Sequence, residues 1–541
     1  MMIGKTNRRV FLRRVLQTAA AVPTASAAAC SWLTAAKEQE GWPINPYGNT
    51  WTGDEYAGAH TMLHGSVPKD DVVERHDEPY DVVVIGAGLS GLTAAYLARR
   101  YRILLLEQAD DIGGNARVLR WGEHLYGTGS TYFAELEPDD LRWKIYRELE
   151  LQVFWRRVDP RDRLTYESDG LRQLPFARRD VEQLAEQVEH FERKLRDRLR
   201  EIDVPWIRSD EWSREAYEAT DRKTLKVFLE DEIGELHPLL ARYIEANSLA
   251  AFAAHADEVS AYCGLFFLAD DLFDTYVLPG GNGLVGLRML HSLRKHGRFT
   301  LQTGMMARAV HQSDTGVDVL AVGRDGKGHR YRARKAILAC PKFIARRIVS
   351  DLPPEQEAAM SRLSYRAYVV ANLLLKRAPK RSFFDIYHVE PQLTAGAAAD
   401  DPTSDSTNAS YARPGTGRGS VLTIFKPYAR DDGAETLAGG SLYAPNAGAD
   451  FSAVAKQIRK EATPILEAVG LDASDIHDVN LTRWGHAMIF SAPGQLADGT
   501  VATASKPFGR ITFANQDAQG APAIENAMSA AIRAVADAGL L

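Results

Sequence analysis

The feature that most constrains the fold lies at residues 80–114, where strand, glycine turn, helix, strand and acid follow one another without interruption. The apolar run at 80–85 predicts a buried parallel strand, and the sequence GAGLSG at 86–91 opens a helix that should end near Arg100. A second apolar strand leads to Glu107, about 20 residues after the turn. This order is typical of a βαβ unit that binds a dinucleotide.

Each glycine of the turn has a physical task. Gly86 makes the tight turn, Gly88 lets a pyrophosphate approach the backbone, and Gly91 lets helix and strand pack closely. The helix N-terminus offers unpaired N–H groups and a partial positive charge to the phosphates. The Glu107 carboxylate would accept hydrogen bonds from a ribose diol and repel a 2'-phosphate. The residues predicted to bind the dinucleotide in this unit are Gly86, Ala87, Gly88, Ser90, Gly91, Glu107 and Gln108.

A second match to the same glycine pattern, GNGLVG at 281–286, does not predict a second site. It follows Pro279 and Gly280 where a full apolar strand would be needed, and the strand after its helix, 299–302, ends without an acid. The sequence therefore predicts one dinucleotide site of this type.

The glycine pair that follows Glu107, Gly113 and Gly114, resembles the diglycine of the flavin-containing amine oxidase superfamily. Further segments that resemble this family lie at 278–283, 336–341, 483–484, 492–494, 509–517 and 523–527. The resemblance covers about residues 78–541, and it implies an FAD-dependent amine oxidoreductase. No cysteine lies in the C-terminal motif, so the resemblance implies FAD that is not covalently attached.

The resemblance also implies further cofactor-binding residues, and the sequence departs from the family at some of them. The implied residues are Gly114, Asn115, Arg117, Gly129, Ser130, Met306, Ala339, Asn515, Asp517, Ala523 and Ile524. The usual Gly-Gly-Arg becomes a diglycine with its arginine displaced by two positions, to Arg117. The usual Phe-Ala-Gly ends in Asn515, and Val-Glu-Gly-Ala becomes 524–527. These changes resemble the periplasmic polyamine dehydrogenase branch of the family.

The predicted fold class is α/β, with an FAD-binding Rossmann-type domain that contains a parallel sheet, interleaved with a mixed α+β substrate domain. The FAD domain is predicted at 78–140, 275–345 and 480–541, the substrate domain at 141–274 and 346–479, and a linker at 31–77. Leu184, Val188, Phe191, Leu195, Leu199 and Ile202 form a stripe of helical spacing that predicts packing. Strands are predicted at 299–302, 317–322, 336–339, 365–376 and 420–426, with a long polar loop at 391–419.

Residues 1–30 resemble a bacterial twin-arginine signal peptide, with Arg8 and Arg9 ahead of an alanine-rich apolar stretch. Export by this route implies a periplasmic or otherwise exported protein that folds around its cofactor first. Cleavage could follow 25–27, or the chain could be lipidated at Cys30 and anchored as a lipoprotein. No later segment is an apolar run of about 18 residues, so no transmembrane span is expected.

The composition excludes some function classes. Lys and Arg number 65 against 71 Asp and Glu, for a net charge of -6, which leaves no electrostatic footprint for nucleic acid. Three cysteines cannot build a disulfide scaffold. No metal site is predicted.

The implied reaction is hydride transfer from the carbon beside an amine nitrogen to N5 of the flavin. Tyr132 and Trp484 are the candidate pocket residues, because each lies beside a family motif that approaches the flavin. His486 could act as a base or a substrate hydrogen-bond partner, or be structural. Other aromatic residues, which could line the pocket or belong to the core, are Tyr126, Phe133, Phe266, Phe267, Tyr276 and Phe490.

The small-molecule partners are expected to be an amine, such as a polyamine, and an electron acceptor, which is a quinone, a cytochrome or oxygen. Asp270, Asp271 and Asp274 could attract a cationic polyamine or simply form a solvated helix end. Many amine oxidases hold a lysine by water against the flavin, and none of Lys342, Lys376 or Lys506 occupies that position in the sequence. A quinone or cytochrome is therefore favoured over oxygen as the acceptor.

Other functions share parts of this pattern. A carotenoid-type desaturase or isomerase would need a wide apolar tunnel, and a flavin-dependent sugar mutase would need arginines that face a nucleotide diphosphate. A non-catalytic maturation factor could retain FAD for stability alone. Reduction of the flavin by an amine would distinguish an amine oxidoreductase from these three alternatives.

Overall fold

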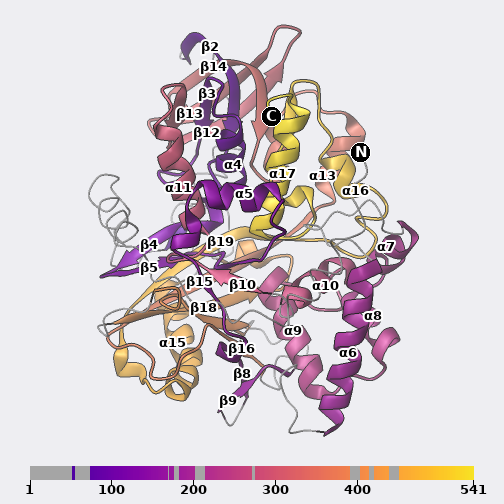
Figure 1. Cartoon of the computed structure of the whole chain (residues 1–541). Coiled ribbons are helices and arrows are strands. Elements are labelled where there is room, and N and C mark those ends of the chain that lie inside the picture. Colours follow the sequence, from indigo (N-terminus) through magenta and orange to yellow (C-terminus); the bar gives the residue numbers. More distant parts are fainter. Residues whose placement is uncertain are drawn as a thin grey trace.

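The computed structural model describes residues 51–54, 73–167, 170–175, 182–201, 214–270, 274–389, 402–413, 419–437 and 450–541. Two large sheets organise these residues, one in the upper half of Figure 1 and one in the lower half. The predicted signal peptide at 1–30 and Cys30 lie outside the described residues. In the described part of the chain, no helix is long and apolar enough to cross a membrane.

The upper sheet contains the predicted dinucleotide unit. Its strands are β11 (Phe299–Gln302), β3 (Ile103–Leu106), β2 (Val73–Ile85), β14 (Gly328–Leu338), β13 (Val317–Gly323) and β12 (Met305–Gln312), in that order, and β20 (Ile511–Phe513) pairs with β14. The pairs β11–β3, β3–β2, β2–β14 and β14–β20 are parallel, whereas β13 is antiparallel to both of its neighbours, β12 and β14. The sheet is therefore a parallel Rossmann-type core with an antiparallel extension.

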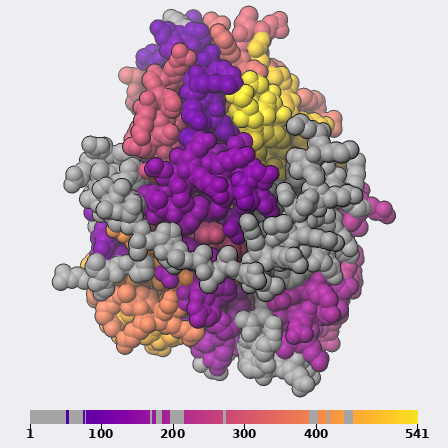
Figure 2. Space-filling view, viewed as in Figure 1, coloured from indigo at the N-terminus to yellow at the C-terminus, as the bar shows by residue number. Residues whose placement is uncertain are grey.

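The last part of strand β2, residues 82–85, is apolar and buried on both faces. Val82 and Val84 belong to one hydrophobic cluster, and Val83 and Ile85 belong to another. This is the pattern expected of a parallel strand that is buried on both sides. Helix α4 (Leu89–Leu97) and the C-terminal helix α17 (Ile524–Asp537) pack side by side there (Figures 1 and 2). Residues from the two ends of the described chain thus share one layer.

The lower sheet belongs to the second domain. Its strands are β1 (Thr52–Gly53), β19 (Ile476–Phe490), β15 (Ser364–Leu375), β18 (Ser420–Tyr428), β17 (Asp405–Asn408), β16 (Asp385–His388), β8 (Arg163–Glu167) and β9 (Gly170–Gln173), in that order. Alternate residues of β15 divide between two clusters: Val369 and Leu373 pack with residues of helix α15 (Phe451–Ala468), and Tyr368 and Val370 with Trp484. One face of this sheet therefore packs against α15. The other face, with Tyr368, Val370 and Trp484, borders the cavity described below.

Helices and short strands complete the structure. The remaining helices are α5 (Leu141–Glu148), α6 (Glu182–Glu201), α7 (Arg214–Asp221), α8 (Leu225–Ile233), α9 (Pro238–Phe252), α10 (Ala261–Asp270), α11 (Gly283–Arg294), α12 (Lys342–Ile348), α13 (Pro354–Ser361), α14 (Gly433–Leu437) and α16 (Thr500–Ala504). A small sheet joins β6 (Tyr132–Ala134), β10 (Thr275–Val277) and β7 (Arg156–Arg157), and β4 (Val118–Trp121) pairs with β5 (His124–Gly127). Leu184, Val188 and Phe191 of α6 are buried, which confirms the packing stripe over the part of it whose side chains are described.

The sequence predicts several strands to within a few residues, and other segments differ. The strand at 299–302 is β11, whereas β14 begins earlier than the predicted 336–339, because its first half pairs with β13. Strand β17 lies within the stretch predicted as a loop at 391–419. Strand β1 and the first residues of β2 lie within the predicted linker, and β19 crosses the domain boundary predicted at 480.

Candidate active site

A cavity of about 1080 Å³ lies between the two sheets and continues along the carboxyl ends of β2 and β3. Nearly all of the predicted site residues line it, although they come from segments far apart in the sequence. The predicted residues that line the cavity are Gly86, Gly88, Ser90, Glu107, Gln108, Gly114, Asn115, Arg117, Gly129, Ser130, Tyr132, Met306, Ala339, Trp484, His486, Asn515, Ala523 and Ile524.

Two predicted residues near the glycine turn support the cavity from behind. Ala87 donates its backbone N–H to Oε2 of Glu107 at 2.7 Å. A Cβ placed on Gly91 would lie 1.8 Å from the carbonyl oxygen of Gly86, so only glycine allows the helix to approach the strand this closely. These residues shape the turn and do not line the cavity.

Glu107 is buried at the end of β3, where its carboxylate lines the cavity. Besides the contact with Ala87, its Oε1 accepts a hydrogen bond from the backbone N–H of Ala109 at 2.9 Å. Burial raises the pKa of the Glu107 carboxyl, and the hydrogen bonds from the backbone of Ala109 and Ala87 oppose this shift. The carboxylate is thus fixed in position at the place where a ribose diol is expected.

The diglycine loop faces the glycine turn across a narrow gap. Gly88 and Gly113 form a parallel β-bridge, and a Cβ on Gly88 would lie 3.8 Å from the Cα of Gly114. Gly113 and Gly114 have φ angles of 108° and 57°, in the region that favours glycine. Two backbones without side chains therefore border the start of α4, and the N-cap residue Gly88 offers no side-chain acceptor to its N–H groups. This arrangement fits a pyrophosphate.

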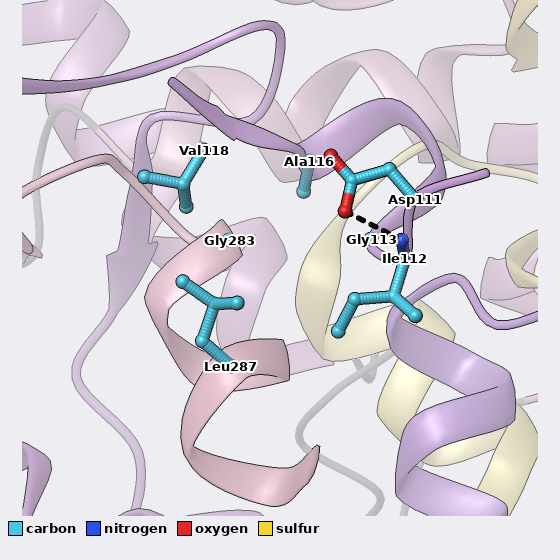
Figure 3. Close-up of a pocket in the computed structure, with 7 residues that line it drawn as sticks. All are labelled: Asp111, Ile112, Gly113, Ala116, Val118, Gly283 and Leu287. Atoms are coloured by element: carbon cyan, nitrogen blue, oxygen red, sulfur yellow. Dashed lines mark hydrogen bonds between the residues drawn. The ribbon is translucent and has the colours of Figure 1, made fainter. Parts of the chain in front are cut away.

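The second glycine motif, 281–286, packs against the diglycine loop and does not line the main cavity. Figure 3 shows this contact. A separate cavity of about 10 Å³ lies there, between the Asp111–Gly113 loop and the start of α11. Such a space suits about one water molecule and excludes a dinucleotide. A Cβ on Gly283 would lie 2.2 Å from the carbonyl oxygen of Ala116, so this glycine serves close packing. Of the two glycine motifs, only the first, at 86–91, therefore borders a cavity large enough for a dinucleotide.

The C-terminal motif closes the cavity from the opposite side. Asn515 lines the cavity and donates from Nδ2 to the carbonyl oxygen of Ala339 at 3.1 Å. Ala523, the N-cap residue of α17, lines the cavity and makes no side-chain cap, so the start of this helix faces the cavity. Gln516, which the sequence analysis missed, also lines the cavity. Together with Glu107 and the glycine turn, these groups fit FAD.

Asp517, in contrast, does not line the cavity. It is fully buried and forms an ion pair with Nζ of Lys342 at 2.6 Å, and it accepts a hydrogen bond from the Tyr365 hydroxyl at 2.7 Å. This network joins the C-terminal motif to α12 and β15. A buried charge pair of this kind is costly to break, because the remaining partner would stay buried and uncompensated. Asp517 therefore positions the C-terminal motif from behind.

The three candidate catalytic residues, Tyr132, Trp484 and His486, all line the cavity. Trp484 is buried, donates from Nε1 to the carbonyl oxygen of Thr128 at 2.8 Å, and lies 5.3 Å from the guanidinium of Arg117. The ring of His486 packs 4.5 Å from the ring of Phe343. Burial lowers the pKa of His486 to about 4, so this imidazole is neutral at physiological pH.

The far wall of the cavity carries two buried carboxylates that sequence analysis missed. Asp385 of β16 and Asp405 of β17 line it together with Tyr387 and Thr407, which lie opposite Asp405 and Asp385 in the strand register. Asp405 accepts a hydrogen bond from Oγ of Ser404 at 2.6 Å. Burial raises the pKa of Asp405 to about 7. A cation bound beside Asp405 would stabilise the charged form of this carboxylate.

Other predicted contacts lie elsewhere. Asp274 pairs with Arg157 outside the cavity, Asp271 lies outside the described residues, and nothing is described of the Asp270 side chain. Phe267 lines the cavity, whereas the following aromatic residues do not: Tyr126, Phe133, Phe266, Tyr276 and Phe490. Aromatic residues that sequence analysis did not connect with the pocket line it instead, namely Phe343, Tyr365, Tyr368, Tyr387 and Phe425. Among the described residues, no lysine lines the cavity.

Comparison with known proteins places this geometry in a family. The sequence model of the family described as flavin containing amine oxidoreductase matches residues 89–538. The oxidoreductase PigB of a Serratia species is 26% identical over 516 residues, which represent 84% of this chain and 74% of PigB.

Solved structures share the fold. Wild-type putrescine oxidase bound to putrescine aligns with a TM-score of 0.61 and 18% identity, over 85% of this chain and 99% of that chain. The cyclohexylamine oxidase of Brevibacterium oxydans aligns with a TM-score of 0.60 and 18% identity, over 85% and 99% of the two chains. The chain belongs to the flavin-containing amine oxidoreductase family and is an FAD-dependent oxidoreductase.

Proposed function

We propose that this enzyme oxidises an amine that carries a second positive charge, as a short polyamine does. The observation that carries the proposal is the pair of buried carboxylates, Asp385 and Asp405, on the cavity wall opposite the glycine turn. Bound FAD would accept a hydride from the carbon beside the amine nitrogen. The protein itself would bind the charged end of the substrate, orient the reacting carbon toward the flavin and exclude water.

Asp405 is the better placed of the two carboxylates to bind a cation. Asp385 lies opposite Arg163 of β8 in the strand register, so a positive charge is already near it. Burial raises the pKa of Asp405, and the hydrogen bond from Ser404 opposes this shift. An ammonium group at Asp405 would lower that pKa and stabilise the charged pair.

The aromatic walls support a cationic substrate as well. Tyr368 and Tyr387 line the cavity beside the carboxylates, and aromatic faces attract ammonium groups. The neutral His486 does not repel a cation, and its ring can accept a hydrogen bond from an amine N–H. A desolvated site also favours the neutral form of the reacting nitrogen, which must lose its proton before the adjacent carbon releases hydride.

The electron acceptor is proposed to be a quinone or a cytochrome. No lysine lines the cavity in the part of the chain that the structure describes, and Lys342 is held in the ion pair with Asp517. Lys376 donates to the carbonyl oxygen of Ser474, away from the cavity. Stopped-flow reoxidation of the reduced enzyme should be slow with oxygen and fast with a soluble quinone. Fast reoxidation by oxygen alone would make the protein an oxidase.

Export through the twin-arginine route is proposed from Arg8 and Arg9 ahead of the apolar stretch. Replacing both by lysine should retain the full-length chain in the cytoplasm of a bacterial host, and the wild type should reach the periplasmic fraction. Labelling with a fatty-acid analogue tests the lipid anchor, because only lipidation makes the label depend on Cys30. Equal fractionation of the wild type and the arginine variant would contradict export by this route.

The test of the proposed reaction is anaerobic mixing of the holoenzyme with a panel of reductants. A diamine should bleach the flavin fastest, a monoamine of the same chain length more slowly, and the corresponding alcohol not at all. Bleaching by a polyene would support the desaturase reading. A flavin that no compound reduces would favour a non-catalytic role.

A further inference from the structure

Two histidines and a glutamate lie together on one face of the upper sheet, outside the cavity. Glu74 and His76 belong to the first part of β2, and His329 belongs to β14, where it lies opposite Glu74 in the parallel register. Residues two apart on a strand point to the same side, so this register gathers all three side chains on one face. Among the described residues, their ligand atoms lie within 4.8 Å of one another.

The separation of the two imidazoles suits a shared metal ion. Nε2 of His76 lies 3.3 Å from Nδ1 of His329, and the same Nδ1 lies 3.7 Å from Oε2 of Glu74. Two nitrogens bound to one tetrahedral zinc at normal bond lengths are about 3.3–3.4 Å apart. In the absence of an ion, the same distance allows a hydrogen bond between the two rings.

The surroundings hold the ring of His76 in place while leaving the site open to solvent. The ring of His76 stacks on that of Tyr331, with centroids 4.4 Å apart and planes 7° from parallel. Tyr331 is buried and donates from its hydroxyl to Oε1 of Gln302, which fixes the stacking surface. The side chain of His329 is 16% exposed and that of Glu74 is 63% exposed, so an ion has a path to the site. Water could complete the coordination.

We propose that Glu74, His76 and His329 bind a divalent transition-metal ion such as zinc. Imidazole nitrogens suit zinc, copper and nickel, and a carboxylate oxygen is an accepted third ligand for zinc. Sequence analysis predicted no metal site, because His329 lies more than 250 residues from the other two ligands and only the β2–β14 pairing brings them together.

The ion would have a structural role separate from flavin chemistry. Nine residues of β2 separate His76 from Gly86 at the glycine turn, and the β14 partners of His76 and Ile85, which are Tyr331 and Leu338, lie seven positions apart, or about 23 Å. The metal would tie the outer part of β2 to β14, whose pairing changes register between Tyr331 and Ala333. Metal binding should therefore stabilise this edge of the domain without changing the visible spectrum of the flavin.

The test is calorimetric titration of zinc chloride into tag-free holoenzyme that has been dialysed against a chelator. We expect one zinc ion per chain and a raised melting temperature in its presence. H76Q and H329Q should each weaken zinc binding at least about tenfold, because each removes one of three protein ligands. E74Q, at the most exposed of the three positions, should weaken binding with no effect on folding.

His311 provides a matched control on the same sheet. Nδ1 of His311 lies 3.9 Å from Asp351, and its side chain is 60% exposed, so it is a histidine beside a carboxylate without a second imidazole in the cluster. H311Q should leave zinc binding unchanged. Flavin absorbance of each variant confirms that it is folded. No heat of zinc binding in the wild type, or binding that H76Q, H329Q and E74Q leave unaltered, would overturn the proposal.

Discussion

In the proposed function, Asp405 binds the second positive charge of the substrate. We predict that D405N raises KM for a diamine by about 10–100-fold, because a charge-assisted hydrogen bond contributes about 1.5–3 kcal/mol. The same substitution should change KM for a monoamine much less. Steady-state kinetics with a quinone acceptor measure both values. Equal effects on the two substrates would exclude Asp405 as the site of the second cation.

The pH dependence of this residue has a definite sign. Its pKa of about 7 means that Asp405 is mostly neutral below that pH and charged above it. The wild-type kcat/KM for a diamine should therefore rise as the pH increases through about 7, and D405N should lose this rise. The pKa of Asp405 is higher in the folded protein than in the unfolded chain. The free energy of unfolding should therefore fall as the pH rises from the unfolded-state pKa, about 3.9, to about 7. D405N should thus melt at a higher temperature than wild type at pH 8, with little difference at pH 4.

Glu107 is the residue on which cofactor affinity should depend most. E107Q keeps the size of the side chain but removes the charge, and its amide group would face the backbone N–H of either Ala87 or Ala109. We expect FAD affinity to fall about 10–100-fold in E107Q, and E107K to retain no FAD. Fluorescence titration of the deflavinated proteins measures the affinity. The exposed Glu78 is the control, and E78Q should bind FAD as wild type does.

At the scale of elements, the turn between β2 and α4 contains glycines with different roles. A Cβ on Gly88 meets no atom closer than 3.8 Å, so G88V should fold and yet exclude the pyrophosphate. A Cβ on Gly91 would overlap the Gly86 carbonyl oxygen, so G91A should destabilise the fold itself. Circular dichroism and flavin content distinguish these outcomes. G88V with full flavin content would mean that the turn is only structural.

How far the elements could be predicted depends on the strength of their local pattern. The unit from β2 to β3 follows from apolar runs, because buried parallel strands exclude polar residues, whereas β11 is a half-buried edge strand in which apolar and polar residues alternate. Strand β17 has the sequence DSTN, which has little β propensity, and it forms because β16 and β18 pair with it on both sides. Asp405 was missed for the same reason, since sequence analysis placed it in a loop.

At the scale of the whole molecule, the cavity joins residues from Gly53 to Ala527, and FAD should therefore stabilise both ends of the chain together. Removing FAD should lower the melting temperature, because a ligand that binds only the folded state contributes about 4 kcal/mol when its free concentration is about 1,000 times Kd. Differential scanning calorimetry of the deflavinated and reconstituted enzyme measures the change. An identical melting temperature for both would contradict a cofactor shared between the two ends of the chain.

Sequence motifs predict the residues expected to bind the cofactor, whereas tertiary pairing brings together the residues proposed to bind the substrate. Glycine turns and Glu107 have fixed spacing because a dinucleotide has fixed dimensions. Asp385, Tyr368 and Tyr387 reach the cavity only because the strands of the lower sheet pair in one particular register. No spacing in the sequence encodes that register, so these residues could not be predicted.

The most direct test of the central claim is the rate of anaerobic flavin bleaching by a diamine and by the same diamine deuterated at the carbons beside nitrogen. If the enzyme removes hydride from that carbon, the deuterated compound should bleach the flavin several times more slowly at saturating concentration. Equal bleaching rates at saturation would mean that breaking the C–H bond beside nitrogen does not limit the rate of flavin reduction. A flavin that neither compound bleaches would contradict amine oxidation altogether.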